Sequence, residues 1–129
     1  IPLAILFPDC HFRLIDGTGK KVMVASEVAK AIGLKNVEAV HRRGEEEKDK
    51  FDFVVSRAVM PLPDMVKIVR KNISTQQHNA LQNGIITLKG GNLDDEIKPY
   101  RKIIEITAIS DFFSEDFFEE KNVVYLPVY

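Results

Sequence analysis

Polar or glycine-rich residues follow directly on four stretches that have the composition of β-strands. These residues are Asp16 with Gly17, the run His41 to Glu45, Ser56 with Arg57, and the run Lys89 to Gly91. In open α/β sheets, ligands bind at the carboxyl ends of the strands, so the four sets could line one small-molecule pocket. A carboxylate in that place, such as Asp16, can accept hydrogen bonds from the two hydroxyls of a ribose. The guanidinium of Arg57 can bind a carboxylate or a phosphate through two parallel hydrogen bonds.

Each of these residues also has a purely structural interpretation. Asp16 could form an Asx turn, and Arg57 could pair with Asp16 or Glu45 in a structural ion pair. Lys89 and the two glycines after it could form an ordinary turn from a strand to a helix. The basic run His41 to Arg43 could contact RNA phosphates or could form a solvated edge. The residues alone leave both interpretations open at each position.

Composition and motifs narrow the functional classes. The 129 residues suffice for one domain or a piece of one, and the net charge of −1 gives no overall field that would attract nucleic acid. A single cysteine, Cys10, excludes an internal disulfide and fits a reducing compartment. The histidines are scattered, so we expect no metal, and neither a nucleophile elbow nor a Walker loop is present. With no apolar run near the ~20 residues of a membrane span and no signal peptide, we expect a cytoplasmic protein without a membrane partner.

Periodicity predicts helices and strands that alternate along the chain. Helices are expected over 2–7, 20–32, 63–72 and 94–102, and strands over 11–16, 36–41, 51–56, 84–89, 103–110 and 122–128. The first helix is expected to be buried, Pro99 to disturb the last helix, and Pro127 to mark an edge strand or a strand end. The runs 45–50 and 74–84 are predicted to be solvated loops. This alternation indicates an α/β domain with a mostly parallel sheet, in which the last two strands pair antiparallel.

Several stretches occur in an order and at a spacing that resemble one family. They are IPLAILFPDCHFRLID followed by GKK, then RRGEEE, then FDFVVSRAV with PLPDMV, and finally LKGG. Through them, nearly the whole chain resembles the small-subunit (16S) ribosomal RNA guanine-N7 methyltransferases, the glucose-inhibited division protein B (GidB/RsmG) family. The resemblance implies a Rossmann-like class I methyltransferase that uses S-adenosylmethionine as its cofactor.

The resemblance also implies that part of the domain lies outside this sequence. The family has a central strand and a glycine-rich cofactor loop directly ahead of the IPLAI stretch, with which this chain opens. Residues 1–129 are therefore expected to be the C-terminal portion of a single S-adenosylmethionine-dependent domain, whose sheet is incomplete on its N-terminal side. Without the central strand, we expect the chain alone to be inactive and its free strand edges to invite association.

Matching positions carry the family's cofactor contacts over to this sequence. The resemblance implies that Asp16, with Gly17 beside it, faces the ribose of the cofactor. It also implies that Gly44 and Glu45 line the adenine pocket, although the family more often has alanine or valine where Gly44 stands. Arg57 matches an arginine near the methionine end of the cofactor. Together these residues form the expected S-adenosylmethionine site.

On the substrate side, the resemblance places Arg43 and Lys89 at positions that face ribosomal RNA of the small subunit. No residue is assigned as a catalytic base, because guanine N7 is already nucleophilic and loses no proton when it is methylated. Catalysis would rest on aligning N7 with the methyl group and on excluding water, with the guanine unpaired or splayed out of its helix. The alternative function is a non-catalytic Rossmann-like module that binds a nucleotide or a protein partner.

Overall fold

The computed structural model describes residues 1–57 and 60–128, so Ala58 and Val59 of the VSRAV stretch and the final Tyr129 lie outside the described residues. The chain forms two compact units, Ile1–Glu47 and Lys48–Tyr129. Each unit has its own β-sheet, with two strands in the first and four in the second. Both units also contain helices, which confirms the α/β class, whereas a Rossmann-like arrangement around a central strand stays a prediction.

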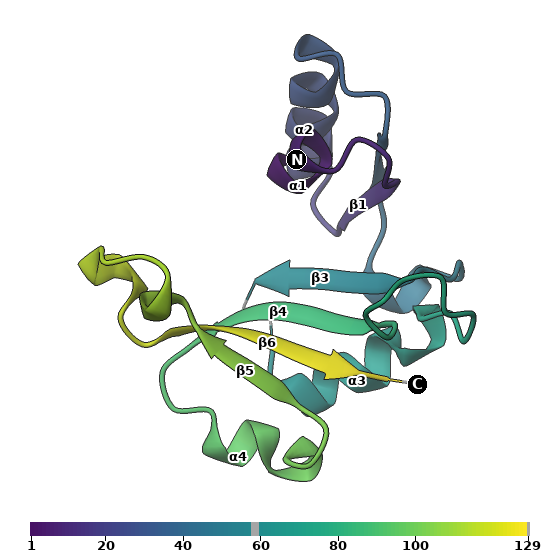
Figure 1. The fold of residues 1–129 in the computed structure, drawn as a ribbon. Coiled ribbons are helices and arrows are strands. Elements are labelled where there is room, and N and C mark those ends of the chain that lie inside the picture. Colours follow the sequence, from purple (N-terminus) through teal and green to yellow (C-terminus); the bar gives the residue numbers. More distant parts are fainter. Residues whose placement is uncertain (58–59, 129) are drawn as a thin grey trace. The chain divides into compact units, whose positions relative to one another are not determined.

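The first unit is a β-α-β arrangement preceded by a short helix (Figure 1). Its elements are α1 (Pro2–Leu6), β1 (Phe12–Asp16), α2 (Gly19–Ala31), β2 (Val37–His41) and the 3₁₀ turn η1 (Gly44–Glu46). The strands are parallel, and their register runs from Phe12 opposite Val37 to Asp16 opposite His41. Helix α2 supplies the crossover connection that a parallel pair needs. The carboxyl ends of β1 and β2 therefore lie side by side, as the sequence predicts.

Helix α1 is held by hydrogen bonds to Asn36 rather than by burial. Leu6 is 71% exposed and Ala4 is the buried residue of the helix, so the prediction of a buried first helix is wrong. The side-chain amide of Asn36, directly ahead of β2, donates to the carbonyl oxygens of Ala4, Phe7 and Cys10 at 3.1, 3.2 and 2.9 Å. These bonds join the side chain of Asn36 to carbonyl groups in and after α1, and so they hold α1 to the start of β2.

The second unit is a four-stranded mixed sheet. Its strands are β3 (Phe53–Arg57), β4 (Gly84–Gly90), β5 (Glu105–Ala108) and β6 (Lys121–Pro127), in the spatial order β3-β4-β6-β5. Its helices are α3 (Leu62–Val69) and α4 (Asp94–Ile97), and its 3₁₀ turns are η2 (Arg70–Asn72), η3 (Lys98–Tyr100), η4 (Ile109–Asp111) and η5 (Asp116–Phe118). β3 and β4 are parallel. β6 runs antiparallel to both β4 and β5, which confirms the antiparallel pairing predicted for the last two strands.

Two prolines mark the ends of regular structure in this unit. Pro99 lies in η3, where the segment that begins as α4 changes to 3₁₀ geometry, so the predicted disturbance of that helix is confirmed. Pro127 ends β6. Because β6 has a neighbour on each side, Pro127 marks a strand end and not an edge strand.

The core of the second unit lies between the sheet and the helices on one of its faces (Figure 1). Buried apolar side chains from α3, β4 and β6 form this core, namely Leu62, Met65, Val66, Ile85, Val124 and Leu126. The other face of the sheet is open within this unit, and Val55 on it is 49% exposed. An apolar sheet face is stable only when a second layer covers it. In the second unit, helices therefore cover one face of the sheet, and no described layer of the same unit covers the other face.

The stretch 74–84, predicted to be a solvated loop, is irregular up to Asn83 and anchored from inside. Asn83 is fully buried, and its amide nitrogen donates to the carbonyl oxygens of Ser74 and Gln76, each at 2.8 Å. The hydroxyl of Tyr125 donates to a further carbonyl of the stretch at 2.6 Å. Burial, with Glu105 as a second cause, raises the pKa of this phenol above its ordinary value, which favours the protonated form that donates the bond.

The described part of the chain lacks two kinds of feature. No described helix combines the length and the apolar character that crossing a bilayer requires. Among the same residues, no three histidine, cysteine, aspartate or glutamate side chains are grouped so that they could hold a metal ion.

Candidate functional site

The turn that follows β1 is fixed by hydrogen bonds from both sides. The Oδ1 atom of Asp16 accepts a hydrogen bond from the backbone N–H of Thr18 at 2.8 Å, which is an Asx turn. At the end of the neighbouring strand β2, ring atom Nε2 of His41 donates to the carbonyl oxygen of Gly17 at 3.0 Å. Among the described residues, Oδ2 of Asp16 makes no hydrogen bond. The Asx turn thus orients the carboxylate and leaves one of its oxygens available to a ligand.

The side chain of Arg43 lies against the same turn. A Cβ atom built on Gly17 would lie 3.4 Å from Cγ and 3.6 Å from Nε of Arg43, and one built on Gly19 would lie 3.5 Å from Cε1 of His41. Arg43 is exposed, so its guanidinium can reach a ligand at the turn or a phosphate in solvent. The structure therefore brings together Asp16, Gly17 and Arg43, which the sequence singles out. It adds His41, which the sequence treats only as part of a basic run.

Gly44 and Glu45 lie on η1, the turn that follows β2. The carboxylate of Glu46 accepts a hydrogen bond from the backbone N–H of Arg43 at 3.0 Å, and this bond fixes the start of the turn. Glu45 is exposed and Gly44 is half-buried. The two residues thus stand at the carboxyl end of β2, where an adenine pocket is expected, and their role in that pocket stays a prediction.

Glu47 is a buried carboxylate that the sequence does not reveal. It is 4% exposed, and its oxygens accept hydrogen bonds from Nη1 of Arg13 at 2.9 Å and from Nη1 of Arg42 at 2.8 Å. The prediction that the run 45–50 is solvated is therefore wrong at Glu47. The two arginines come from β1 and from the residue after β2, so the carboxylate ties the ends of the first unit's elements together.

We expect that replacing Glu47 with glutamine lowers the free energy of unfolding by about 1–3 kcal/mol, because two arginines then lose their charged acceptor. The measurement is urea unfolding of the full-length protein, followed by circular dichroism. Glu38→Gln is the matched control, since Glu38 pairs with Arg13 at 3.4 Å but its side chain is 47% exposed. Its effect should stay within about 0.5 kcal/mol. Equal losses for the two variants would contradict a special role for Glu47.

Arg57 ends β3 and is exposed. The hydroxyl of Ser56, the residue before it, bonds to the hydroxyl of Thr87 at 3.1 Å on the face covered by α3. Successive strand residues point to opposite faces, so Arg57 belongs to the open face of the sheet. Within the described part of the second unit, no ion pair engages its guanidinium. Arg57 is therefore a cation at a strand end that is available to an anionic group.

Lys89, by contrast, is used inside the protein. It is 7% exposed, and its Nζ atom pairs with Oε1 of Glu96 at 2.6 Å and donates to the carbonyl oxygen of Met60. The same Glu96 oxygen accepts a hydrogen bond from the backbone N–H of Leu62 at 2.7 Å. The buried pair thus holds the segment 60–62. The RNA contact expected of Lys89 stays untested, and its burial favours a structural role.

The predicted convergence of these side chains on one pocket stays a prediction. Asp16, Arg43 and Glu45 belong to the unit Ile1–Glu47, whereas Arg57 and Lys89 belong to Lys48–Tyr129. Each unit therefore contributes its own set of polar residues at the carboxyl ends of parallel strands.

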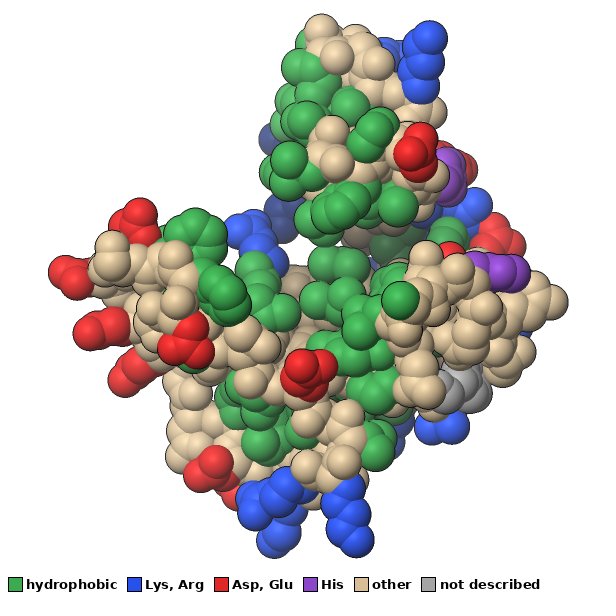
Figure 2. All heavy atoms as spheres, in the orientation of Figure 1, with side chains coloured by type: hydrophobic (Ala, Val, Ile, Leu, Met, Phe, Trp, Pro, Cys, Tyr) green, Lys and Arg blue, Asp and Glu red, His purple; other side chains and the backbone are tan. Residues whose placement is uncertain are grey.

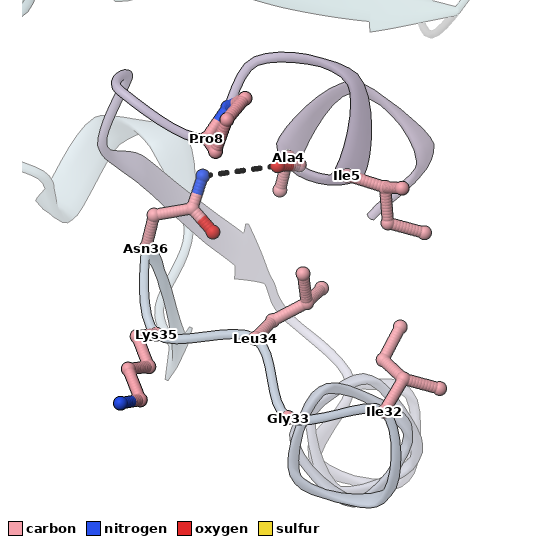
Figure 3. A pocket seen from close by; sticks show the side chains of 8 residues that line it. All are labelled: Ala4, Ile5, Pro8, Ile32, Gly33, Leu34, Lys35 and Asn36. Atoms are coloured by element: carbon pink, nitrogen blue, oxygen red, sulfur yellow. Dashed lines mark hydrogen bonds between the residues drawn. The ribbon is translucent and has the colours of Figure 1, made fainter.

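A pocket in the first unit lies at the other end of its strands (Figure 3). It is lined by Ala4, Ile5, Pro8, Ile32, Gly33, Leu34, Lys35 and Asn36. Its wall comes from the residues that precede β1 and β2, so it opens at their amino ends. Most of the lining is apolar, and Figure 3 shows the amide of Asn36 directed at the carbonyl of Ala4. This pocket offers little polar chemistry, and the strand ends near Asp16 remain the candidate site.

The sequence of the chain matches a protein-family model. The family model GidB, described as "rRNA small subunit methyltransferase G", matches residues 1–124. The chain belongs to the GidB family. This agrees with the resemblance seen in the IPLAI, RRGEEE and LKGG stretches.

Curated members of the GidB family support the match at high identity. Proteins named "Ribosomal RNA small subunit methyltransferase G" from Parabacteroides distasonis, Bacteroides fragilis and Porphyromonas gingivalis are 62%, 59% and 54% identical to this chain. In each case the alignment covers 99% of this chain, but only 56%, 62% and 58% of the relative. The chain thus spans somewhat more than half the length of the curated relatives it matches.

Proposed function

We propose that the chain is the C-terminal portion of a methyltransferase that transfers the methyl group of S-adenosylmethionine to N7 of a guanine in 16S ribosomal RNA. The observation that carries the proposal is the GidB family match over residues 1–124. The names of the curated relatives support ribosomal RNA of the small subunit as the substrate. The cofactor, the N7 position and a cytoplasmic location are the finer parts of the proposal.

The first unit offers groups that fit the nucleoside part of the cofactor. The free Oδ2 of Asp16, held outward by the Asx turn, can accept hydrogen bonds from ribose hydroxyls. Arg43 and His41 pack against the same turn and limit its freedom. Gly44 and Glu45, on the turn after β2, would then border the adenine.

In the second unit, Arg57 would hold the carboxylate of the cofactor's methionine part. Its open position at the end of β3 suits this role, because no partner among the described residues of that unit competes for it. When bound, S-adenosylmethionine supplies an electrophilic methyl group on a positively charged sulfur. Guanine N7 can take that methyl without losing a proton, so this chain needs no general base. Its residues would instead orient the two reactants and exclude water.

The test is calorimetric titration of the full-length protein with S-adenosylmethionine, using the Asp16→Asn variant. Asparagine can still accept the Thr18 N–H, so the Asx turn survives while the charge is lost. We expect the variant to bind about 10- to 100-fold more weakly, since hydrogen bonds to a charged group contribute about 1.5–3 kcal/mol. Asp9→Asn, at an exposed residue outside the site, is the control and should bind like the wild type.

Two outcomes would count against the proposal at different levels. Unchanged affinity in Asp16→Asn would leave Asp16 with its structural role only. No detectable binding by the full-length wild type, together with no transfer of labelled methyl to 16S RNA, would remove the enzyme. It would favour the alternative, a non-catalytic nucleotide- or protein-binding module.

A further inference from the structure

The connection between β5 and β6 displays phenylalanine rings to solvent. Phe112 and Phe117 are each 73% exposed and Phe113 is 55% exposed. Single exposed apolar residues are common, but contiguous aromatic patches on a soluble protein mark interaction surfaces. We name these three residues, together with Phe118, the phenylalanine cluster.

The cluster is organised before any partner arrives. Phe118 is half-buried, and its ring contacts those of Phe113 and Phe117 at centroid distances of 5.4 and 5.3 Å. The backbone is folded into the turns η4 and η5, with N–H groups of Phe112 and Phe118 donating at 3.0 and 2.9 Å to carbonyls three residues earlier. Rings fixed in this way lose little conformational freedom on binding, which favours their use as anchors.

The surroundings of the cluster are strongly acidic. Exposed carboxylates occur throughout the segment that carries the rings, namely Asp111, Glu115, Asp116, Glu119 and Glu120. Figure 2 shows acidic and apolar side chains together on the part of the surface formed by the β5–β6 connection. The one basic residue of the segment 109–121, Lys121, places its Nζ 5.6 Å from the centroid of the Phe117 ring. A cation already occupies one ring face, and other ring faces remain open.

The negative charge of the segment 109–121 determines which class of partner it can bind. RNA phosphates and anionic lipid headgroups would be repelled by the carboxylates. A second copy of this chain would bring the same negative charge to a contact between two such clusters. A basic protein segment is complementary to both the exposed rings and the negative charge, because arginine or lysine can lie over the rings and pair with the carboxylates.

We propose that the phenylalanine cluster is a docking surface for a basic protein segment. Arginine or lysine side chains of the partner cover the exposed rings of Phe112, Phe113 and Phe117, in the way that Lys121 lies over one face of Phe117. The surrounding carboxylates pair with the remaining positive charges. None of the predicted cofactor contacts belongs to the segment 109–121, although this segment meets the end of β4, where the backbone N–H of Gly91 donates to the carbonyl oxygen of Glu120 at 3.1 Å.

The experiment measures fluorescence anisotropy of a labelled twelve-residue Arg/Ser peptide with the full-length protein. A Glu/Ser peptide of equal length is the ligand control. The double variant Phe112→Ser/Phe117→Ser should bind at least 10-fold more weakly than the wild type. The variant Glu115→Gln/Asp116→Asn/Glu119→Gln should lose a similar factor, together with most of the salt dependence. Leu81→Ser, which alters an exposed leucine elsewhere in the second unit, should bind like the wild type.

Unchanged peptide affinity in the phenylalanine variant would overturn the proposal. So would binding of poly(U) that this variant abolishes, because RNA would then be the partner. Hydroxyl-radical footprinting supplies the last outcome. Rapid oxidation of Phe112 and Phe117 in the full-length protein would support the proposal, because the surface would then be free. Protection would overturn it, because another segment of the same protein would then already cover the cluster. Thermal unfolding of each variant verifies that the fold is retained.

Discussion

Replacing Lys89 with methionine is expected to lower the free energy of unfolding of the full-length protein by about 3–5 kcal/mol, the usual cost of removing one partner of a buried ion pair. Methionine fits the length of the lysine stem, so packing changes little. The loss arises because the Glu96 carboxylate stays partly buried without its cation and the Met60 carbonyl loses its donor. Chemical denaturation of the variant measures the effect.

The control for this prediction is Lys98→Met, because Lys98 is exposed on η3. Its effect should stay within about 0.5 kcal/mol. The double variant Lys89→Met/Glu96→Gln should recover part of the loss, since no unpaired charge then remains. A Lys89→Met protein with wild-type stability but with reduced methylation of RNA would contradict the structural role and support an RNA contact.

The second large effect concerns residues 1–129 as a separate protein. We expect this chain to bind no S-adenosylmethionine, to transfer no methyl group and to self-associate. We expect the full-length protein to bind S-adenosylmethionine, to transfer the methyl group and to stay dispersed. Over the residues that the structure describes, β1 pairs with β2 alone, and β3 and β5 are the outer strands of their sheet, so both units present strands with an unpaired edge. Such edges pair readily with other chains.

Exposed apolar side chains add to this tendency. Met23 and Val24 of α2 are more than half exposed, as is Ile32 directly after the helix, and Val55 lies on the open face of the second sheet. Light scattering coupled to gel filtration, at several concentrations, measures the association. The full-length protein, run under the same conditions, is the control. A cooperative and monomeric thermal transition of the 1–129 chain would contradict the prediction.

Elements with a local signal were predictable from the sequence. Each of these signals determines the structure of neighbouring residues: the alternation in HFRLID, the glycine after α2, and the prolines at 99 and 127. The predicted strand ends are confirmed for the same reason: Asp16 and His41 are register partners at the carboxyl ends of parallel strands. The antiparallel last strand followed from the lack of an apolar helix between the last two strands.

Residues whose environment depends on distant partners were not predictable. Glu47 lies in a charged run that resembles a solvated loop, yet it is buried because Arg13, 34 residues earlier in the chain, meets it. Lys89 resembles a surface residue beside two glycines, yet Met60, 29 residues earlier, accepts its hydrogen bond. The exposure of α1 was not predictable for a similar reason, because the apolar composition of a segment does not show which element will pack against it.

The candidate site was predictable only in part. The strand-end rule located Asp16 and Arg57, because both follow strands with clear patterns. It did not show that Asp16 forms an Asx turn with a free oxygen or that His41 bonds to the carbonyl of Gly17. Such contacts depend on register and rotamer, which the sequence pattern does not encode.

The position of β6 affects how the second unit can form during synthesis. β6 is made after β4 and β5, yet it lies between them and supplies Val124 and Leu126 to the core. Until these residues leave the ribosome, β4 and β5 lack their shared neighbour, and α3 has an incomplete surface to pack against. The second unit therefore gains its cooperative stability only after β6 has been synthesised, and a nascent chain that stops before Lys121 is exposed to proteases.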